Sequence, residues 1–327
     1  MRAVVCTATG GPEVLAVSEL PDLSPGQREV LIDVRATALN RADLLQRRGL
    51  YPPPPGVSEL LGLECSGVVA QLGVGASRFP VGARVMALLG GGGYAEQVVV
   101  HEELLLPVPE RLSFEEAAAV PEGFLTASEA LLTEAELSPG QSVLVTAAAS
   151  GVGSAAVQIA AERGGFVIGS ASEGKLRAVA ELGADVTLAR DREDFVEALL
   201  CCTHGRGVDA IVDFIGGSAL ARHQQCLAPG GRLVLVGLLG GASASLDLSR
   251  ILMKRQRICG LVMRSRSLDE KIALTAQFER ELLPALASGA LMPRLDRVFS
   301  LAEVADAHRY MEQNRNTGKI VLSLAQR

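Results

Sequence analysis

The stretch from residue 142 to residue 236 alternates between short apolar runs and helical patterns, and this alternation restricts the possible folds more than any other feature. It begins with VLVTAAASGVGSAA at 143–156, where a β-branched run, a turn of small residues and the start of an apolar-periodic helix follow one another. Alternation at this spacing is typical of βαβ units, whose right-handed crossovers build a parallel, doubly wound sheet. The sequence therefore predicts an α/β domain that opens with this strand, turn and helix.

The expected elements of this domain are short and closely spaced. Strands are expected at 142–147, 166–171, near 186, 208–213, 231–236 and 257–262, and helices at 151–163, 174–182, 191–200 and 218–227.

The residues before this domain have a different pattern. Residues 1–110 contain β-branched or alternating runs between Gly/Pro turns, which predicts a barrel-like β unit. One helix is expected at 40–48, and after it Tyr51 and four prolines form an extended loop that is neither helix nor central strand. Residues 113–135 turn helical and are expected to join the two domains.

The residues after the alternating region return to mixed structure. One long amphipathic helix is expected at 268–288, a strand at 294–299, a helix at 303–314 and a final strand at 319–324. We expect this remainder to return to the first domain, so that the chain divides into 1–120, 121–262 and 263–327.

Composition narrows the class of protein. The 327 residues, 48% of them hydrophobic, suffice for two hydrophobic cores. The sequence contains no run of about 18 uncharged apolar residues, so we do not expect a membrane span. The net charge of −6 and the absence of Trp argue against a general nucleic-acid surface. The six cysteines are scattered without a Cys-x-x-Cys pair, which excludes a structural Cys₄ zinc site and favours a reducing compartment. With no signal-peptide pattern at the start, we expect a cytoplasmic protein.

The turn after the first strand of the alternating region predicts a dinucleotide site. Its pattern is Gly151-x-Gly153-x-x-Ala156, which lets the backbone approach a pyrophosphate at the N-terminus of a helix. The alternative is that the two glycines only allow close packing of the helix on the sheet. The position of the pattern, in the first turn of a βα series, favours the cofactor.

The end of the second strand predicts which dinucleotide binds. NAD-binding units usually carry an acidic residue there that accepts from the ribose 2′-OH, whereas this chain has Ser170, Ala171 and Ser172. Lys175 follows, and Arg190 after the third strand has the guanidinium that suits a 2′-phosphate. Although Lys175 taken alone would be a solvated helix residue and Glu173 is a discordant charge, we predict NADPH rather than NADH.

Two further glycine clusters follow strand ends. They are Ile215-Gly216-Gly217 and Gly237-Leu238-Leu239-Gly240-Gly241. Because the carboxyl ends of the strands in an open α/β sheet face the ligand, we expect both loops to contact the ribose and nicotinamide, the alternative being ordinary turn glycines.

From end to end the chain resembles the zinc-independent quinone oxidoreductases of the medium-chain dehydrogenase/reductase superfamily. The resemblance is carried by ALNRADLLQRRGLYPPPP at 38–55, LGLECSGVV at 61–69, GGGYAEQVVV at 91–100, AAASGVGSAAVQIA at 147–160, KLRAVAELGAD at 175–185, VDFIGG at 212–217 and NTGKIVL at 316–322. Within that family, SGVG at 150–153, FIGG at 214–217, VGLLGG at 236–241 and MRSRS at 263–267 are most similar to the tumour-suppressor-inducible and zeta-crystallin-like members.

The resemblance implies a GroES-like β-rich catalytic domain together with a Rossmann domain, and an active site in the cleft between them. It also implies NADPH, a homodimer formed by edge pairing of the two sheets, with a tetramer as the alternative, and no catalytic zinc. The zinc enzymes use a Cys and a Gly-His-Glu run where this chain has Asn40 and Gly62-Leu63-Glu64. Val152, Asn316 and Lys319 are further cofactor contacts implied by the resemblance.

Three positions depart from the family pattern. Ser150 stands where many relatives have Gly, Arg190 where many have Tyr, and Ala83 where Asp is usual. We expect Ser150 to shape the nicotinamide pocket and to influence the choice of substrate.

A quinone accepts hydride readily, so the catalytic problem is mainly one of orientation. We assign the substrate slot to Asn40, Asp43, Tyr51, Thr126 and the loop with Leu238 and Leu239, with Tyr51 as a stacking partner or proton donor. Without the family resemblance, Asn40 would be a helix N-cap and Asp43 a first-turn acid. The predicted activity is NADPH-dependent reduction of quinones, most of all ortho-quinones, or of other α,β-unsaturated carbonyls. The alternatives are an enoyl-thioester reductase and a non-catalytic NADPH-binding or RNA-binding crystallin-like protein.

Overall fold

A computed structural model describes residues 1–324 of the chain and divides it into two compact units. Unit 1 contains Met1–Leu125 together with the described residues from Met263 onward, and unit 2 contains Thr126–Val262. The chain therefore leaves unit 1 once, builds unit 2 from a continuous segment, and returns.

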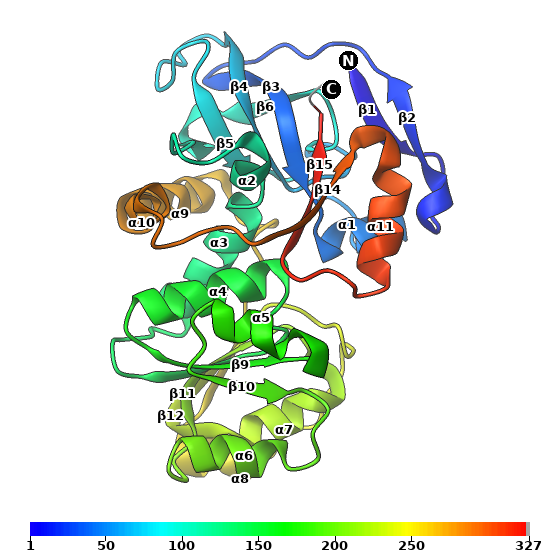
Figure 1. The fold of residues 1–327 in the computed structure, drawn as a ribbon. Helices are drawn as coiled ribbons and strands as arrows, with labels where there is room; N and C mark the ends of the chain where they lie inside the picture. Colours follow the sequence, from blue (N-terminus) through cyan, green and yellow to red (C-terminus); the bar gives the residue numbers. More distant parts are fainter. Residues whose placement is uncertain (325–327) are drawn as a thin grey trace. The chain divides into compact units, whose positions relative to one another are not determined.

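Unit 1 is built on a seven-stranded mixed sheet (Figure 1). Its path is β14-β15-β3-β4-β5-β7 with β6 paired to β3, all pairs being antiparallel except β14 with β15, and β1 and β2 form a separate antiparallel pair. The long strand β3 has β4, β6 and β15 as neighbours. Its buried Val30, Ile32 and Val34 lie in one apolar core with Ile320 of β15.

The elements of unit 1 before the crossing to unit 2 are β1 (Arg2–Cys6), η1 (Pro12–Val14), β2 (Leu15–Glu19), β3 (Glu29–Ala38), α1 (Arg41–Arg47), β4 (Glu64–Leu72), β5 (Arg84–Leu88), β6 (Gln97–His101), η2 (Glu102–Leu104), β7 (Leu105–Pro107) and α2 (Phe114–Ala118). Those after the return are α9 (Leu268–Glu281), α10 (Leu283–Ser288), β14 (Leu295–Ser300), η6 (Leu301–Glu303), α11 (Val304–Glu312) and β15 (Lys319–Ser323). Helix α3 (Pro121–Ser128) carries the chain from the first unit into the second.

Unit 2 contains the predicted parallel sheet. Its strand order is β10-β9-β8-β11-β12-β13, and every pair is parallel, which confirms the predicted α/β fold. Figure 1 shows α4 and α5 on one face of this sheet and α6, α7 and α8 on the other. Because β8 lies beside both β9 and β11, the turn after β8 stands where the strand order reverses, the usual ligand position in such sheets.

The elements of unit 2 are η3 (Glu129–Glu134), β8 (Ser142–Val145), α4 (Gly151–Glu162), β9 (Phe166–Ala171), η4 (Glu173–Lys175), α5 (Leu176–Glu181), β10 (Val186–Ala189), α6 (Phe195–Cys202), β11 (Val208–Asp213), η5 (Gly217–Ala219), α7 (Leu220–Gln225), β12 (Leu227–Leu235), α8 (Leu248–Lys254) and β13 (Arg257–Gly260).

Two helices differ from the sequence predictions. The single helix predicted at 268–288 is wrong, because Leu282 leaves the helical conformation and separates α9 from α10. Pro284 explains the break, since its ring would clash with the carbonyl four residues earlier in a continuous helix. Helix α8 was not predicted, although Asp247 is an ordinary N-cap that accepts hydrogen bonds from the N–H groups of Ser249 and Arg250.

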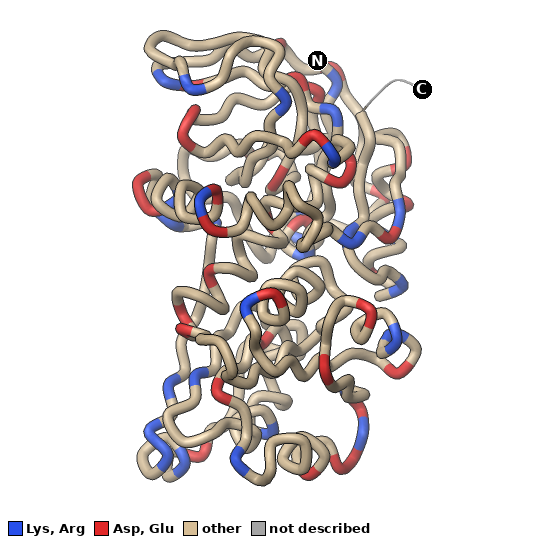
Figure 2. Tube along the Cα trace, turned by 60° about the vertical axis from the view of Figure 1, so that its left-hand side comes forward, with Lys and Arg blue, Asp and Glu red and all other residues tan. Residues whose placement is uncertain are grey.

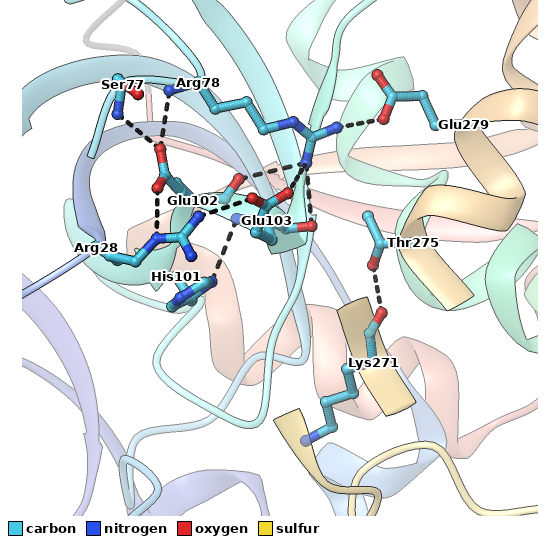
Figure 3. A network of polar contacts seen from close by, with 9 residues as sticks. All are labelled: Arg28, Ser77, Arg78, His101, Glu102, Glu103, Lys271, Thr275 and Glu279. Carbon is cyan, nitrogen blue, oxygen red and sulfur yellow. Dashed lines mark hydrogen bonds and ion pairs between the residues drawn. The ribbon is translucent and has the colours of Figure 1, made fainter. Parts of the chain in front are cut away.

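A network of charged residues ties the sheet of unit 1 to the returning helix α9 (Figure 3). Glu102 is buried and accepts from the N–H groups of Ser77 at 2.7 Å and Arg78 at 2.8 Å and from Arg28 Nε at 2.9 Å. The guanidinium of Arg78 then pairs with Glu279 of α9. Segments about 200 residues apart in sequence are thereby joined within one unit.

Glu102→Gln is expected to destabilise the protein at neutral pH and to lose this effect in acid. The Ser77 N–H, the Arg78 N–H and Arg28 together outweigh burial and lower the pKa of Glu102 to about 2. A carboxylate with a lowered folded-state pKa adds stability above its unfolded value of 4.5 and loses it as the pH falls toward 2. The difference in Tm between the wild type and the variant should therefore be large at pH 7 and narrow at pH 3. Glu103→Gln, in the same network but more exposed, serves as the control, and a gap that does not change with pH would contradict the assignment.

Figure 2 shows acidic and basic residues interspersed along both units. The pairs in which both side chains are exposed, such as Arg177 with Glu181, contribute at most about 1 kcal/mol each. Buried charges are different, because each needs a partner within the fold.

Candidate active site and cofactor-binding region

Three strand ends of unit 1 bring together Asn40, Glu64 and Lys319. Leu39 N–H donates to the Ile320 carbonyl, so Lys319 lies beside Asn40, and Glu64 begins the strand on the other side of β3. Lys319 Nζ contacts a Glu64 carboxylate oxygen and donates to Asn40 Oδ1 at 2.7 Å, and Asn40 Nδ2 donates to Glu64 Oε1 at 2.9 Å. All three side chains are buried. The result is a closed cluster in which a Lys ammonium and an amide neutralise a buried carboxylate.

These residues do not fit a catalytic zinc site. The amide of Asn40 and the apolar Leu63 replace the thiolate and imidazole that zinc prefers, and the ammonium of Lys319 already occupies the remaining carboxylate of Glu64. Within residues 1–324 no three His, Cys, Asp or Glu side chains are grouped so that they could hold a metal.

Asp43 lies deeper, beneath the start of α1. Its carboxylate accepts from the Asn40 N–H at 2.7 Å, the Gly62 N–H at 3.1 Å and the Tyr94 hydroxyl at 3.1 Å. Burial raises the pKa of Asp43 to about 6, although the hydrogen bonds from these three donors lower it. The structure thus assigns Asp43 the task of holding Asn40 and α1 in place, while its contact with a substrate stays a prediction.

Tyr94 connects Asp43 to a buried His–Arg pair. Its hydroxyl lies 3.3 Å from His308 Nε2, and Arg47 Nη1 lies 2.9 Å from His308 Nδ1. Burial lowers the pKa of His308 to about 3, so the imidazole is neutral. Since Arg47 only donates, Nδ1 accepts and Nε2 carries the hydrogen, which directs the hydrogen bonds from Arg47 through His308 and Tyr94 to Asp43.

Tyr51 lies at the start of the Pro-rich loop, beside Arg264 and Glu122. Arg264 Cζ lies 5.2 Å from the centroid of the Tyr51 ring. Glu122 donates its backbone N–H to Glu64 Oε2 at 2.8 Å, and burial together with the charge of Glu64 raises the pKa of its own carboxyl to about 8. The pKa of Tyr51 is raised by burial and by the charge of Glu122 and lowered by Arg264.

Glu122, Arg264 and the role of Glu64 as the centre of the cluster were not predicted from the sequence. Glu122 follows Pro121 at the start of α3, where an acidic residue is normal in any helix. Its proximity to Glu64 depends on a contact 58 residues away in sequence, for which the local pattern contains no signal.

In unit 2 the glycine-rich turn takes the form expected of a phosphate site. Ser150 Oγ caps α4 by accepting from the Gly153 N–H at 3.0 Å, and a Cβ at Gly153 would collide with the Ala147 carbonyl. The first-turn N–H groups of Gly151 and Val152 have no partner within the helix, as at any helix N-terminus. Ser150 is therefore engaged as a cap, and its catalytic role stays a prediction.

The two other glycine loops are held against each other. Gly240 N–H donates to the Ile215 carbonyl at 2.6 Å, and a Cβ at Gly217 would collide with the Gly240 carbonyl. Gly216 and Gly217 have φ values of 59° and 51°, a conformation that favours glycine. In the facing loop, Gly237 N–H donates to the Asp213 carbonyl, and Leu238 and Leu239 are largely exposed.

A buried Asp–His pair supports these loops. Asp213 Oδ1 accepts from the N–H groups of Ile215 at 2.7 Å and Gly216 at 3.1 Å, and Oδ2 lies 2.7 Å from His223 Nδ1. Burial would raise the pKa of Asp213, but the hydrogen bonds from His223 and the two N–H groups hold it below its ordinary value. This pair was not predicted from the sequence.

The residues predicted to select the cofactor lie at neighbouring strand ends. Ser172 follows β9 and Arg190 follows β10, and Arg190 N–H donates to the Ala171 carbonyl at 2.8 Å. Lys175 N–H donates to the Ser172 carbonyl, so it lies in the first turn after the same strand. Arg190 is exposed and pairs with Asp191.

The other predicted cofactor contacts have partners of different kinds. Thr126 is buried, and its hydroxyl has no hydrogen-bond partner among residues 1–324. Asn316 Nδ2 donates to the Gly318 carbonyl at 2.8 Å, and Lys319 belongs to the cluster around Glu64. The orphaned hydroxyl of Thr126 and the glycine turn fit a nicotinamide dinucleotide, whereas for Asn316 and Lys319 contact with it stays a prediction.

Comparison with known families agrees with this geometry. The alcohol dehydrogenase GroES-like domain model matches residues 26–110, and the zinc-binding dehydrogenase model matches residues 151–278. The chain belongs to the medium-chain dehydrogenase/reductase superfamily, with a GroES-like domain and a Rossmann-type domain. It is therefore an oxidoreductase of a superfamily that acts on small molecules with a nicotinamide cofactor.

Individual relatives place it in the quinone oxidoreductase-like part of this superfamily. It is 32% identical to bovine quinone oxidoreductase-like protein 2, over 99% of this chain and 92% of that protein. It is 33% identical to the rat synaptic vesicle membrane protein VAT-1 homolog, over 98% of this chain and 84% of that protein. No helix within residues 1–324 has the length and apolarity needed to cross a membrane.

Solved structures with several activities share the fold. A quinone oxidoreductase of Pseudomonas syringae is 31% identical with a TM-score of 0.87, covering 98% of this chain and 99% of that one. An NAD-dependent alcohol dehydrogenase is 35% identical with a TM-score of 0.88, covering 99% and 100%. The CurK enoyl reductase is 30% identical with a TM-score of 0.88, covering 98% of each chain. The fold and family are common to all three, so the substrate must be argued from the site.

Proposed function

We propose that this protein catalyses the NADPH-dependent reduction of quinones and related α,β-unsaturated carbonyls by direct hydride transfer without zinc. The observation that carries the proposal is the cluster of Asn40, Glu64 and Lys319. Its carboxylate is already neutralised by an ammonium, so the site offers no Lewis acid to polarise an alcohol or a simple ketone. Quinones and enones accept hydride without a Lewis acid, so they are the acceptors that this site favours.

The proposed cofactor is NADPH, which supplies the hydride when bound. Support comes from the end of β9, where Ser172 stands in place of an acidic residue, with Arg190 at the adjacent strand end. A carboxylate there would repel a 2′-phosphate, whereas a hydroxyl and a guanidinium are suited to bind it. The first-turn N–H groups of α4 would hold the pyrophosphate.

Two groups of unit 1 can supply the proton that completes the reduction. Glu122, with its pKa raised to about 8, is mostly protonated at neutral pH, and Tyr51 keeps its phenolic proton well above that pH. Either can protonate the oxygen that carries negative charge after hydride transfer. Asn40 is held by Glu64 and Lys319, so its orientation is set before substrate arrives.

The direct test is NADPH oxidation with a panel of ortho-quinones, para-quinones and enones. We expect turnover with quinones that is unchanged by a zinc chelator and is slower with NADH. Saturable NADPH binding with no oxidation by any acceptor would refute the enzymatic proposal and favour a binding protein.

A second candidate is reduction of an enoyl thioester. The similarity to the CurK enoyl reductase supports it, at an identity close to that of the quinone oxidoreductase. Crotonyl-CoA separates the two candidates. A kcat/KM for crotonyl-CoA that exceeds the best quinone value would favour the thioester, and the reverse is expected here.

We also propose that the protein acts as a homodimer in the cytoplasm. Strand β13 is an open edge of the sheet in unit 2, and the neighbouring helix α8 exposes Leu248, Leu252 and Met253. Open strand edges and contiguous apolar surface favour association. All six cysteines are free, as expected in a reducing compartment.

Replacing both Leu252 and Met253 with Glu is expected to convert the dimer to a monomer, because each charge would be buried at the interface without a partner. Light scattering coupled to size exclusion measures the mass directly. Val74→Glu, at an equally exposed apolar residue of unit 1, should leave the dimer intact. A wild-type protein that runs as a monomer would refute the proposal.

A further inference from the structure

Arg264 is a buried cation in the segment that returns to unit 1, and only 6% of it is exposed. Its guanidinium donates to three separate parts of the unit. Nε donates to the Gly90 carbonyl at 2.7 Å, Nη1 to the Tyr51 carbonyl at 3.3 Å, and Nη2 to Gln46 Oε1 at 2.8 Å. One side chain therefore joins α1, the Pro-rich loop and the turn that follows β5.

The contact with Tyr51 involves both backbone and ring. Besides the hydrogen bond to the Tyr51 carbonyl, Arg264 Cζ lies 5.2 Å from the ring centroid, within the range of a cation–π interaction. The tyrosine at the start of the loop thereby has its main chain and its ring held by the same planar group. Lysine, with a single rotating ammonium, cannot provide that fork.

Arg264 is also connected, through Gln46, to the far end of the Pro-rich loop. Gln46 accepts from Arg264 with its side-chain oxygen and donates its Nε2 to the Glu59 carbonyl at 2.8 Å. The backbone of Arg264 is held as well, because Lys271 Nζ donates to the Arg264 carbonyl at 2.9 Å. The loop from Tyr51 to Glu59, which contains the four prolines, is therefore anchored at both ends by Arg264 and its immediate partner.

The acceptors of Arg264 are all neutral, which distinguishes it from the other buried cations. Arg47 pairs with Glu312 and Lys319 with Glu64, whereas no carboxylate within residues 1–324 forms an ion pair with Arg264. Burial lowers its pKa, and the ionisable groups that oppose this are Tyr51, Asp43 and Glu122. A structural cation would be expected to have a carboxylate partner, so its position over Tyr51 calls for another reason.

We infer that Arg264 is a positioning residue for the reduction, which holds the Tyr51 ring as a fixed flat wall of the acceptor site and so selects planar, conjugated acceptors. The inference rests on the proposed function and goes beyond it, because it names a residue that sets substrate class without itself touching hydride or cofactor. The physical reason is that a preordered ring loses no rotamer freedom when a flat acceptor stacks on it.

The test compares Arg264→Met with the wild type in two backgrounds, native and Tyr51→Ala. We expect Arg264→Met to lower kcat/KM for a planar quinone by about 10 to 100-fold, the scale of a displaced positioning group, with the KM for NADPH changed less than about twofold. In the Tyr51→Ala background the same substitution should cause no further loss, because its target is gone. The kcat/KM of Arg264→Lys for the quinone should lie between the values of Arg264→Met and the wild type.

Arg78→Met is the matched control for stability. Arg78 also donates to two backbone carbonyls of unit 1, but it belongs to the network of Figure 3 and not to the Tyr51 loop. It should lower Tm and leave kcat/KM for the quinone unchanged.

Hydrogen–deuterium exchange of residues 49–60 gives a readout independent of activity. Arg264→Met should speed exchange there, and Arg78→Met should not. Unchanged exchange in Arg264→Met, or losses of activity that add in the Tyr51→Ala background, would overturn the inference. A wild type with no quinone turnover refutes the proposed function instead, and the exchange measurement then still decides whether Arg264 orders the loop.

Discussion

Replacing Lys319 with methionine is expected to lower the free energy of unfolding by about 3–5 kcal/mol, the largest effect on stability that we predict for one substitution. The substitution leaves the carboxylate of Glu64 fully buried without its cation, held only by Asn40 Nδ2 and the Glu122 N–H. Removing one member of a buried ion pair costs far more than the pair itself contributes, since the remaining charge has lost its solvation. Urea denaturation of the wild type and the variant measures the difference.

The control is the double substitution of Lys319→Met with Glu64→Gln. A neutral Gln can still accept from the Glu122 N–H. Its NH2 group then takes the place of Oε1, and because Lys319 no longer holds the Asn40 Oδ1, the Asn40 amide can flip and accept from it. Most of the lost stability should return. Arg177→Met, which breaks an exposed pair on α5, should cost less than about 1 kcal/mol. If the double variant is as unstable as Lys319→Met, the charge of Glu64 is not the cause.

Ser172→Asp is expected to have the largest effect on cofactor choice. A carboxylate at the end of β9, beside Arg190, would accept from a ribose 2′-OH and repel a 2′-phosphate. Like charges brought together cost several kcal/mol, and each 1.4 kcal/mol is a factor of ten. We therefore expect kcat/KM for NADPH to fall by about 10² to 10³ while the value for NADH is unchanged or higher.

The matched control is Ser172→Asn, which has the size of Asp without its charge. It should keep the preference for NADPH within about tenfold. If Ser172→Asn and Ser172→Asp lose kcat/KM for NADPH equally, the effect is due to the size of the side chain and not to its charge. A wild type that prefers NADH would refute the NADPH proposal. Initial rates with both cofactors at a fixed quinone concentration provide the comparison.

The sequence was most informative where local pattern and structure have the same period. The alternation from 142 to 236 predicted the parallel sheet of unit 2, because a strand repeats every two residues and a helix every 3.6 whatever surrounds them. The predictions were wrong or incomplete where a single residue ends or begins a helix regardless of the hydrophobic periodicity around it. Pro284 divides the helix predicted at 268–288, and Asp247 begins the missed helix α8.

The candidate site was only partly predictable for a different reason. Asn40 and Tyr51 were proposed because their neighbours in sequence resemble a known family, and Ser172 because it stands where an acidic residue is usual. Glu122 and Arg264 were not, although Arg264 lies in the MRSRS stretch at 263–267, because the adjacent residues do not show what either side chain contacts. Arg264 meets its partners across 174 to 218 residues of chain. No local pattern can indicate an encounter of that kind.

By itself, then, the sequence determined the alternation of strands and helices from 142 to 236, the glycine turn at the start of α4 and the family. The tertiary structure decided which charges meet in the interior. It brought Lys319 to Glu64 across 255 residues and placed Arg264 over the ring of Tyr51. The physical reason is that backbone periodicity is a local property, whereas the partner of a buried charge is selected only when distant strands and loops pack together.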